Sequence, residues 1–417
     1  MSAVTDREVL RPLVERVLEL AARPEEDARK ELWARHNALL RTDKLPVCVS
    51  FEGIPAPQWD LVFGPNHLRG TGELARRIEF DLRKRVWMAE RVPDDHVVWP
   101  AVLVGAAAAA EHDWGVPLVW RSSGDELGAK AYDPPFADGI VLARLKSART
   151  EVDQAATAAR LAEAGDLVGG RLAVRARYPT LGEAPFDLAV AMRGMERIFL
   201  DVFDNAELLH GLMEFITGAI IADHRRREQR GWINAPPDPS GRYQMIPMMR
   251  HVAGRLAPDF HQRAPGLADE WPYVSAQTSS GLGPEQYAEF VHPYNSRIAE
   301  LFTAKTVYYH GCECLDQKLA VISTLPNLRR QHVSPWSSVR LAAEHYRGAV
   351  VLEVHAHPGK VFFGATRQDL RRELQGLVRA AAGQPINLNL SDIHSLNGNP
   401  DTLRVWAEEA QRVAERA

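Results

Sequence analysis

Histidine and cysteine residues recur at short spacing in the last third of this 417-residue chain. His310 and Cys312 stand two positions apart, and His355 and His357 repeat this spacing further along the chain. Imidazole nitrogen and thiolate sulfur are preferred zinc ligands, and a catalytic zinc site leaves one coordination position open. These residue types at this spacing predict a zinc site with His310, Cys312 and His357 as candidate metal ligands.

Acidic residues at the ends of predicted strands are candidates for proton transfer. Asp392 follows one predicted strand, Glu270 lies at the edge of another, and His355 ends a third. Carboxyl and imidazole groups are the usual general acids and bases of enzymes. We therefore assign Asp392, Glu270 and His355 as candidate catalytic residues, with a structural ion pair as the alternative role for Glu270.

Two arginines on one predicted strand are candidates for holding an anionic substrate. Arg175 and Arg177 alternate with apolar residues in the predicted strand 172–178, so they share one face of it. A guanidinium group binds carboxylate or phosphate in bidentate fashion. We assign Arg175, Arg177 and His394 to substrate binding. For the arginines, a solvent-exposed face on an antiparallel excursion is the alternative.

The remaining cysteines carry less information. The chain has three cysteines, and an odd, sparse count excludes a disulfide framework. A free cysteine commonly serves as a small buried residue, and we interpret Cys48 and Cys314 in that way.

Alternating strands and helices must position these side chains. Strands predicted at 305–309, 349–354 and 386–390 end directly before His310, before His355 and before Asp392 with His394. Near-continuous apolar strands alternating with helices predict a parallel sheet. Eight or so such units over this length predict a (β/α)8 barrel, whose active site lies at the carboxyl ends of the strands.

The barrel is predicted to carry two additions. Residues 1–43 form an N-terminal helical extension, and residues 44–417 form the barrel. Within the barrel, residues 228–267 hold several Pro and Gly and no clear period, which predicts a long lid-like excursion. Three local predictions complete the assignment: short strands at 117–120 and 139–142, a capping box of Asp204 with Glu207, and a short strand at His332–Trp336.

Composition excludes several function classes. Lys and Arg number 50 and Asp and Glu 54, a net charge of −4, which argues against a nucleic-acid-binding surface over the whole protein. The apolar run at 101–110 is too short to span a bilayer. The polar amino-terminal start predicts a cytoplasmic protein. The sequence contains no Walker A loop, complete Gly-x-Gly-x-x-Gly fingerprint, Gly-x-Ser-x-Gly elbow or His-Glu-x-x-His motif.

Several segments resemble the uroporphyrinogen decarboxylase superfamily over nearly the whole chain. The resemblance is to a large branch without assigned activities and to the zinc-dependent, corrinoid-linked methyltransferases, more than to the haem-pathway decarboxylase. An amino-terminal arginine-rich motif of that decarboxylase is not recognisable near residues 45–100. The segments that carry the resemblance are Tyr309–Cys312, Leu325–Arg329, Val333–Trp336, Phe80–Trp87, Val92–Asp95, Gly283–Tyr294 and Leu390–Leu396.

The resemblance implies a (β/α)8 barrel, often dimeric, with its active site in the cleft at the strand ends. The methyltransferase branch binds zinc through a His-x-Cys and a later cysteine, and His310 with Cys312 match the first part. No cysteine follows Cys314. Either the third ligand is a histidine or carboxylate, from the set His355, His357, Asp392 and His394, or the metal differs or is absent.

Two enzymatic hypotheses follow, with a non-catalytic one beside them. The first is a metal-dependent methyl- or one-carbon-group transferase that acts on a small molecule, with zinc as cofactor and a corrinoid protein as methyl donor. The second is a decarboxylase or other lyase that cleaves a small carboxylated substrate by acid–base catalysis without a metal. The third is a ligand-binding barrel that has lost its chemistry.

Overall fold

The computed structural model describes residues 4–110, 114–122, 124, 130–246 and 249–416. Its centre is a parallel sheet of seven strands in the order β1-β15-β14-β13-β12-β11-β8. Every neighbouring pair in this sheet runs parallel, which confirms the predicted α/β architecture. The strands are β1 (Val47–Val49), β8 (Gly182–Glu183), β11 (Tyr273–Val274), β12 (Val307–Tyr309), β13 (Leu328–Val333), β14 (Val351–His355) and β15 (Ile386–Leu390).

Four two-stranded pairs stand apart from this sheet. β2 (Ala101–Gly105) pairs in parallel with β7 (Ala173–Arg177). Among the described residues, no strand pairing joins β1 to β2 or β7 to β8, so the observed ladders form one open sheet and a separate pair. The antiparallel pairs are β3 (Ala108–Ala110) with β6 (Glu151–Val152), β4 (Val119–Ser122) with β5 (Lys130–Asp133), and β9 (Tyr243–Ile246) with β10 (Met249–Arg255).

Two aspartate side chains cover the free edge of β1. The Asp94 carboxylate accepts a hydrogen bond from the backbone N–H of Val49 at 2.7 Å, and the Asp95 carboxylate accepts one from Val47 at 2.9 Å. An edge strand otherwise leaves such N–H groups without a partner. The same segment then meets β10, where the N–H of Val97 donates to the carbonyl of His251. Side chains therefore replace a neighbouring strand where the sheet is interrupted.

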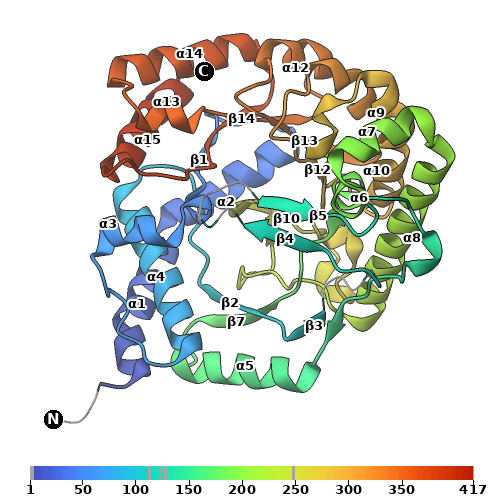
Figure 1. Cartoon of the computed structure of the whole chain (residues 1–417). Coiled ribbons are helices and arrows are strands. Elements are labelled where there is room, and N and C mark those ends of the chain that lie inside the picture. The colour runs from blue at the N-terminus through green and yellow to red at the C-terminus, as the bar shows by residue number, and fades with distance from the viewer. Residues whose placement is uncertain (1–3, 111–113, 123, 125–129, 247–248, 417) are drawn as a thin grey trace.

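Helices lie around the outside of the strands (Figure 1). The two amino-terminal helices are as predicted, and a capping box of Thr5 with Glu8 begins the first. That helix packs against α4 and α5, and the second packs against β10. The α-helices are α1 (Asp6–Ala21), α2 (Pro24–Asn37), α3 (Asp60–Phe63), α4 (Glu73–Arg91), α5 (Gln154–Leu167), α6 (Pro185–Arg193), α7 (Met195–Asp204), α8 (Ala206–Arg230), α9 (Pro284–Phe290), α10 (His292–Ala299), α11 (Leu319–Ile322), α12 (Val339–Tyr346), α13 (Pro358–Phe362), α14 (Arg367–Ala381) and α15 (Asp401–Ala414).

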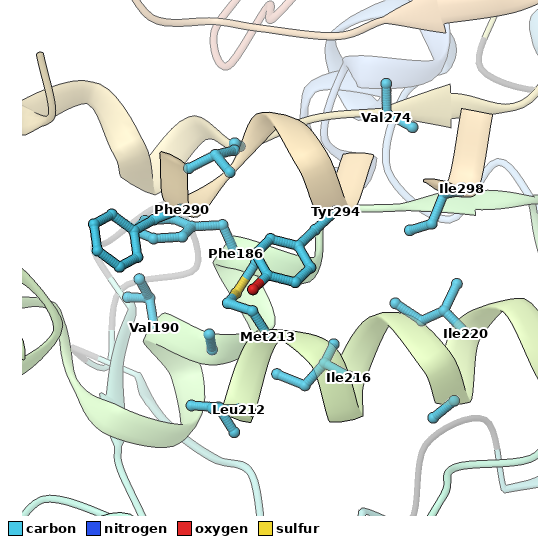
Figure 2. Packing of buried hydrophobic residues seen from close by; sticks show 14 of the residues in the cluster. Phe186, Val190, Leu212, Met213, Ile216, Ile220, Val274, Phe290, Tyr294 and Ile298 are labelled. Carbon is cyan, nitrogen blue, oxygen red and sulfur yellow. The ribbon is translucent and has the colours of Figure 1, made fainter. Parts of the chain in front are cut away.

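The long helix α8 organises one of the hydrophobic cores. Met213 and Ile216 on α8 face Phe290 and Tyr294 of the neighbouring helices, with Phe186 of α6 between them (Figure 2). Burying side chains of this size contributes about 1.5–3 kcal/mol each relative to leaving them exposed. This core holds the helices that support β8, β11 and β12. Within the described part of the chain, none of the helices combines the length and the apolar character needed to span a bilayer.

Four local predictions need correction. Residues 139–142 form no strand, because the chain turns into a 3-10 helix at Leu142–Arg144. The strand that pairs with β4 is β5. The Asp204–Glu207 box does not form, since Asn205 is the N-cap of α8 and makes no side-chain cap. Residues 228–267 are not irregular throughout, because they contain the β9–β10 hairpin, which packs against α2. The strand predicted at 332–336 lies earlier, at Leu328–Val333.

Candidate metal centre at the strand ends

Polar residues alternate with apolar ones along the four neighbouring strands β12–β15. Successive residues of a strand point to opposite faces, so two polar residues two positions apart share a face. The pairing register places His332 beside Glu353, and His355 beside Asn389. The result is a buried polar layer on one face of the sheet. Its members are Tyr308, Arg330, His332, Glu353, His355, Asn387 and Asn389, with the half-buried His310 at its rim.

Three of these strands bring metal-ligating atoms together. One group consists of His310, Cys312 and His332, whose ligand atoms all lie within 4.8 Å of one another. A second group, His332, Glu353 and His355, meets the same limit. In the first group, Nε2 of His310 lies 3.5 Å from Sγ of Cys312. Nε2 of His332 is buried and has no hydrogen-bond partner, which leaves it free to bind a metal.

The hydroxyl of Tyr308 fixes how both imidazoles of the first group are oriented. It donates to Oε1 of Glu353 at 2.9 Å. A phenol has one proton, so the same oxygen can only accept from Nδ1 of His310 at 3.2 Å and from Nδ1 of His332 at 3.1 Å. Both rings then carry their proton on Nδ1 and keep the Nε2 lone pair for a ligand. Such outer hydrogen bonds commonly set the tautomer of metal-binding histidines.

The second group is held together by its own ion pairs. Nε2 of His355 lies 2.7 Å from Oε1 of Glu353, and Arg330 donates to Oε2 of Glu353 at 2.8 Å. Burial alone would raise the pKa of Glu353, but the hydrogen bond from His355 and the charges of His355 and Arg330 outweigh it and hold the pKa far below its ordinary value. A metal in this group would have to break the Glu353–His355 bond. In the first group, a metal would replace only the thiol proton between Cys312 and Nε2 of His310.

The protonation states of the first group suit the binding of a divalent cation. Burial lowers the pKa of both His310 and His332, so both rings are neutral near pH 7, as metal ligands must be. Burial, together with the negative charges of Asp392, Glu313 and Glu353, raises the pKa of Cys312 to about 12. The thiol is therefore protonated in the protein alone, and a divalent cation would displace that proton.

The structure brings some of the predicted site residues together at this centre. His310, Cys312 and His355 meet as described. Asp392 follows β15 on the exposed rim, and its charge acts on both His310 and Cys312. His357 lies at the start of α13 with its ring centroid 5.0 Å from that of Trp336, and it belongs to neither ligand group.

The other predicted site residues lie elsewhere. Glu270 is fully buried before β11 and accepts from the N–H of Asn234 at 2.8 Å. Burial raises its pKa to about 7. His394 is exposed in the loop after β15. Arg175 and Arg177 lie on β7, outside the seven-stranded sheet.

Sequence reasoning missed His332, Glu353 and Tyr308. His332 was placed at the start of a strand, whereas it lies one residue before the end of β13 and so reaches the same rim as His310. Glu353 stands inside an apolar run, and a charged residue there is a signal in itself, because a strand buried on both faces excludes charges that have no partner.

Comparison with known proteins yields a structural likeness. No family model and no curated protein sequence matches the chain. The chain is similar to the solved structure of a methyltransferase from Methanosarcina mazei, with a TM-score of 0.53 and 11% sequence identity over 92% of this chain and 98% of that one. At this identity the likeness establishes a shared fold along nearly the whole length.

Proposed function

We propose that the chain is a zinc-dependent methyl- or one-carbon-group transferase of the uroporphyrinogen decarboxylase-like superfamily, acting on a small molecule. The observation that carries the proposal is the convergence of His310, Cys312 and His332, with a buried, unpartnered Nε2 on His332. The fold shared with a methyltransferase supports the transferase class. The proposal includes a (β/α)8 barrel at residues 44–417, interrupted between β1 and β2, behind the helical extension at residues 1–43.

The donor set suits zinc better than a hard cation. One thiol sulfur and two imidazole nitrogens are typical zinc ligands, whereas magnesium and calcium select oxygen. Three protein ligands leave one position for the acceptor. Zinc held by these three ligands would lower the pKa of an acceptor thiol or similar nucleophile in the open position, so that the acceptor attacks an activated methyl group.

The residues around the ligands have separable roles. Tyr308 orients both imidazoles so that Nε2 points toward the metal position, and Glu353 accepts a hydrogen bond from the Tyr308 hydroxyl. Gln277 lies with Nε2 3.6 Å from Sγ of Cys312, where its N–H can donate to a thiolate. The methyl donor in this proposal is a methyl-corrinoid on a partner protein.

A metal-free lyase is the second candidate function. Nδ1 of His355 lies 2.7 Å from Oγ of Ser391, and its Nε2 lies 2.7 Å from Glu353. This chain of groups leads from the rim into the sheet and is suited to moving a proton. Under this alternative, Asp392 and His355 would act on a small carboxylated substrate.

Metal content separates the two candidates. We expect purified protein to hold about one zinc per chain and Cys312→Ser to lose most of it, because a catalytic zinc has few protein ligands to spare. The matched control is Cys314→Ser, since Cys314 is exposed two residues away and outside both ligand groups. Equal zinc content in all three proteins would contradict the assignment.

Activity can be followed with free methylcobalamin and simple thiols as probes. Zinc-loaded wild type and Cys314→Ser should demethylate methylcobalamin faster than Cys312→Ser does. If exhaustive chelation leaves turnover of a carboxylated substrate intact while Asp392→Asn or His355→Gln abolishes it, the lyase replaces the transferase.

A further inference from the structure

A cavity of about 650 Å³ lies where the sheet is interrupted. α4, β2 and the β9–β10 hairpin contribute its walls, and neither metal-ligand group lines it. A smaller space of about 230 Å³ adjoins it, because Arg177, Met245 and Arg250 line both. The larger volume lies within the range of small-molecule sites, about 300–1,000 Å³.

Two buried imidazoles in the cavity wall have an unpartnered nitrogen. His96 is 2% exposed and His251 is 7% exposed, and both line the cavity. Nε2 of each ring makes no hydrogen bond. Buried polar atoms in native proteins normally have a partner, so both nitrogens are available to a ligand in the cavity.

The neighbour of His96 decides which way its ring is protonated. Nδ1 of His96 is hydrogen-bonded to the carboxylate of Asp94, a group that also accepts from Val49. Burial opposes ionisation of Asp94, but His96 and the N–H of Val49 outweigh it and lower the pKa of Asp94. An ionised carboxylate only accepts, so Nδ1 of His96 donates to it, and Nε2 of the neutral ring is an acceptor.

In the cavity wall, the carboxylate of Glu52 is shared by several positively charged or basic side chains. Glu52 lies 3.5 Å from Nζ of Lys84, 3.3 Å from Nη1 of Arg250 and 3.8 Å from Nε2 of His251. These distances exceed the 2.7–2.9 Å of ordinary charge-assisted hydrogen bonds. One carboxylate is therefore shared by two permanent cations. Over the whole lining, six Lys and Arg residues face four Asp and Glu residues, so the local charge is positive.

We propose that this cavity binds a small organic carboxylate that also carries a hydroxyl or N–H group. Its carboxylate meets Lys84 and Arg250, and its hydroxyl or N–H donates to Nε2 of His96. The site is separate from the metal centre and does not depend on the proposed transferase activity.

The test is a binding titration of the purified full-length protein with matched carboxylates. The probes are benzoate with 3- and 4-hydroxybenzoate, and propionate with lactate. A hydroxyl bonded to His96 should improve affinity about tenfold over its unsubstituted partner, which corresponds to one hydrogen bond of about 1.4 kcal/mol. Inorganic phosphate is the probe for a site that binds any anion.

Variants assign the two ends of the ligand. His96→Gln should remove the preference for the hydroxylated partner, whereas Arg250→Met should weaken every carboxylate. Arg250 has a side chain 38% exposed, so its replacement disturbs little packing and serves if the His96 variant does not fold. Glu52→Gln removes the competing carboxylate and should strengthen binding.

Cys312→Ser is the control, because it changes the metal centre and leaves the cavity intact. Unchanged carboxylate binding in this variant separates the two sites, so each proposal can fail alone. The cavity proposal is overturned if no probe binds with a Kd below about 10 mM. It is also overturned if binding is the same in wild type, His96→Gln and Arg250→Met, or if phosphate binds as well as the hydroxylated carboxylates.

Discussion

The continuous strands β12–β15 and the interrupted region beside β2 differ in how much space surrounds their buried polar side chains. In β12–β15 the pairing is continuous, and buried polar groups on neighbouring strands bond to one another. Beside β2 the pairing is interrupted, and a cavity of about 650 Å³ leaves two imidazole nitrogens without partners.

This difference shows how sheet continuity relates to the chemistry a region can perform. Neighbouring strands lie about 4.8 Å apart, so continuous pairing holds side chains on adjacent strand ends at metal-binding separation without any loop to order them. An interrupted sheet provides volume for a ligand. The proposed metal site therefore lies in the continuous region, and the proposed ligand site lies in the interrupted one.

The largest expected effect is on the buried ion pair of the continuous region. Arg330 and Glu353 are both nearly inaccessible and lie 2.8 Å apart. Glu353→Gln leaves the Arg330 charge buried without its partner and should lower the free energy of unfolding by about 3–5 kcal/mol. Glu344→Gln, in the exposed pair with Arg340, should change it by less than about 0.5 kcal/mol. Equal effects in urea denaturation would contradict the comparison.

Glu270 is a second buried glutamate, and its pKa is shifted in the opposite direction to that of Glu353. Among the residues that the structure describes, none forms an ion pair with Glu270 like that of Arg330 with Glu353, and burial raises the pKa of Glu270 to about 7 in the folded protein against 4.5 as the ordinary value. Its stabilising contribution is therefore complete below pH 4.5 and lost as the pH rises through 7. Glu270→Gln cannot ionise, so at pH 8.5 it should be more stable than wild type by up to about 3 kcal/mol.

The pH series itself is the check on Glu270. The advantage of Glu270→Gln over wild type should shrink steadily as the pH falls from 8.5 to 5, measured as the free energy of unfolding. A constant difference across this range would mean that Glu270 does not titrate there.

The sequence predicted the strands better than it predicted their partners. Strand ends at His310 and His355 follow from long apolar runs, and those runs are buried as expected. In the part of the chain that the structure describes, β1 does not pair with β2, because the side chains of Asp94 and Asp95 accept hydrogen bonds from the N–H groups at the edge of β1. These are tertiary contacts, and no local sequence pattern predicts them. The β9–β10 hairpin was missed for the same reason, since its packing partner α2 is about two hundred residues away.

The candidate ligands show a similar division. The spacing of His310 and Cys312 identified two groups that do meet. The position of His332 at the rim depends on where β13 ends. The predicted strand begins at His332, whereas β13 begins four residues earlier, so His332 lies near its carboxyl end. His357 was favoured by its place in His-x-His, but the chain turns into α13 directly after it and the ring packs near Trp336.

Tyr308→Phe tests the continuous region with a smaller effect. Loss of the hydroxyl frees both imidazoles to rotate and change tautomer, and outer hydrogen bonds of this kind contribute about 10- to 100-fold in metal affinity. We expect zinc affinity, measured by chelator competition, to fall by that factor. Tyr309→Phe is the matched control, because its hydroxyl bonds to Tyr287 on the other side of the same strand. An equal loss of zinc affinity in both variants would contradict the inference that the Tyr308 hydroxyl sets the tautomers of the two histidines.

The smallest expected effect separates two arginines of the interrupted region. Arg175 and Arg177 share a face of β7, but only Arg177 lines the cavity. An exposed charge contributes about 0.2–1 kcal/mol, so Arg177→Met should weaken hydroxybenzoate binding about two- to fivefold. Arg175→Met should leave binding unchanged. The two variants lose the same residue type from the same strand, so a general loss of positive charge would weaken ligand binding equally in both. A difference in binding between them is expected only if the ligand occupies the cavity.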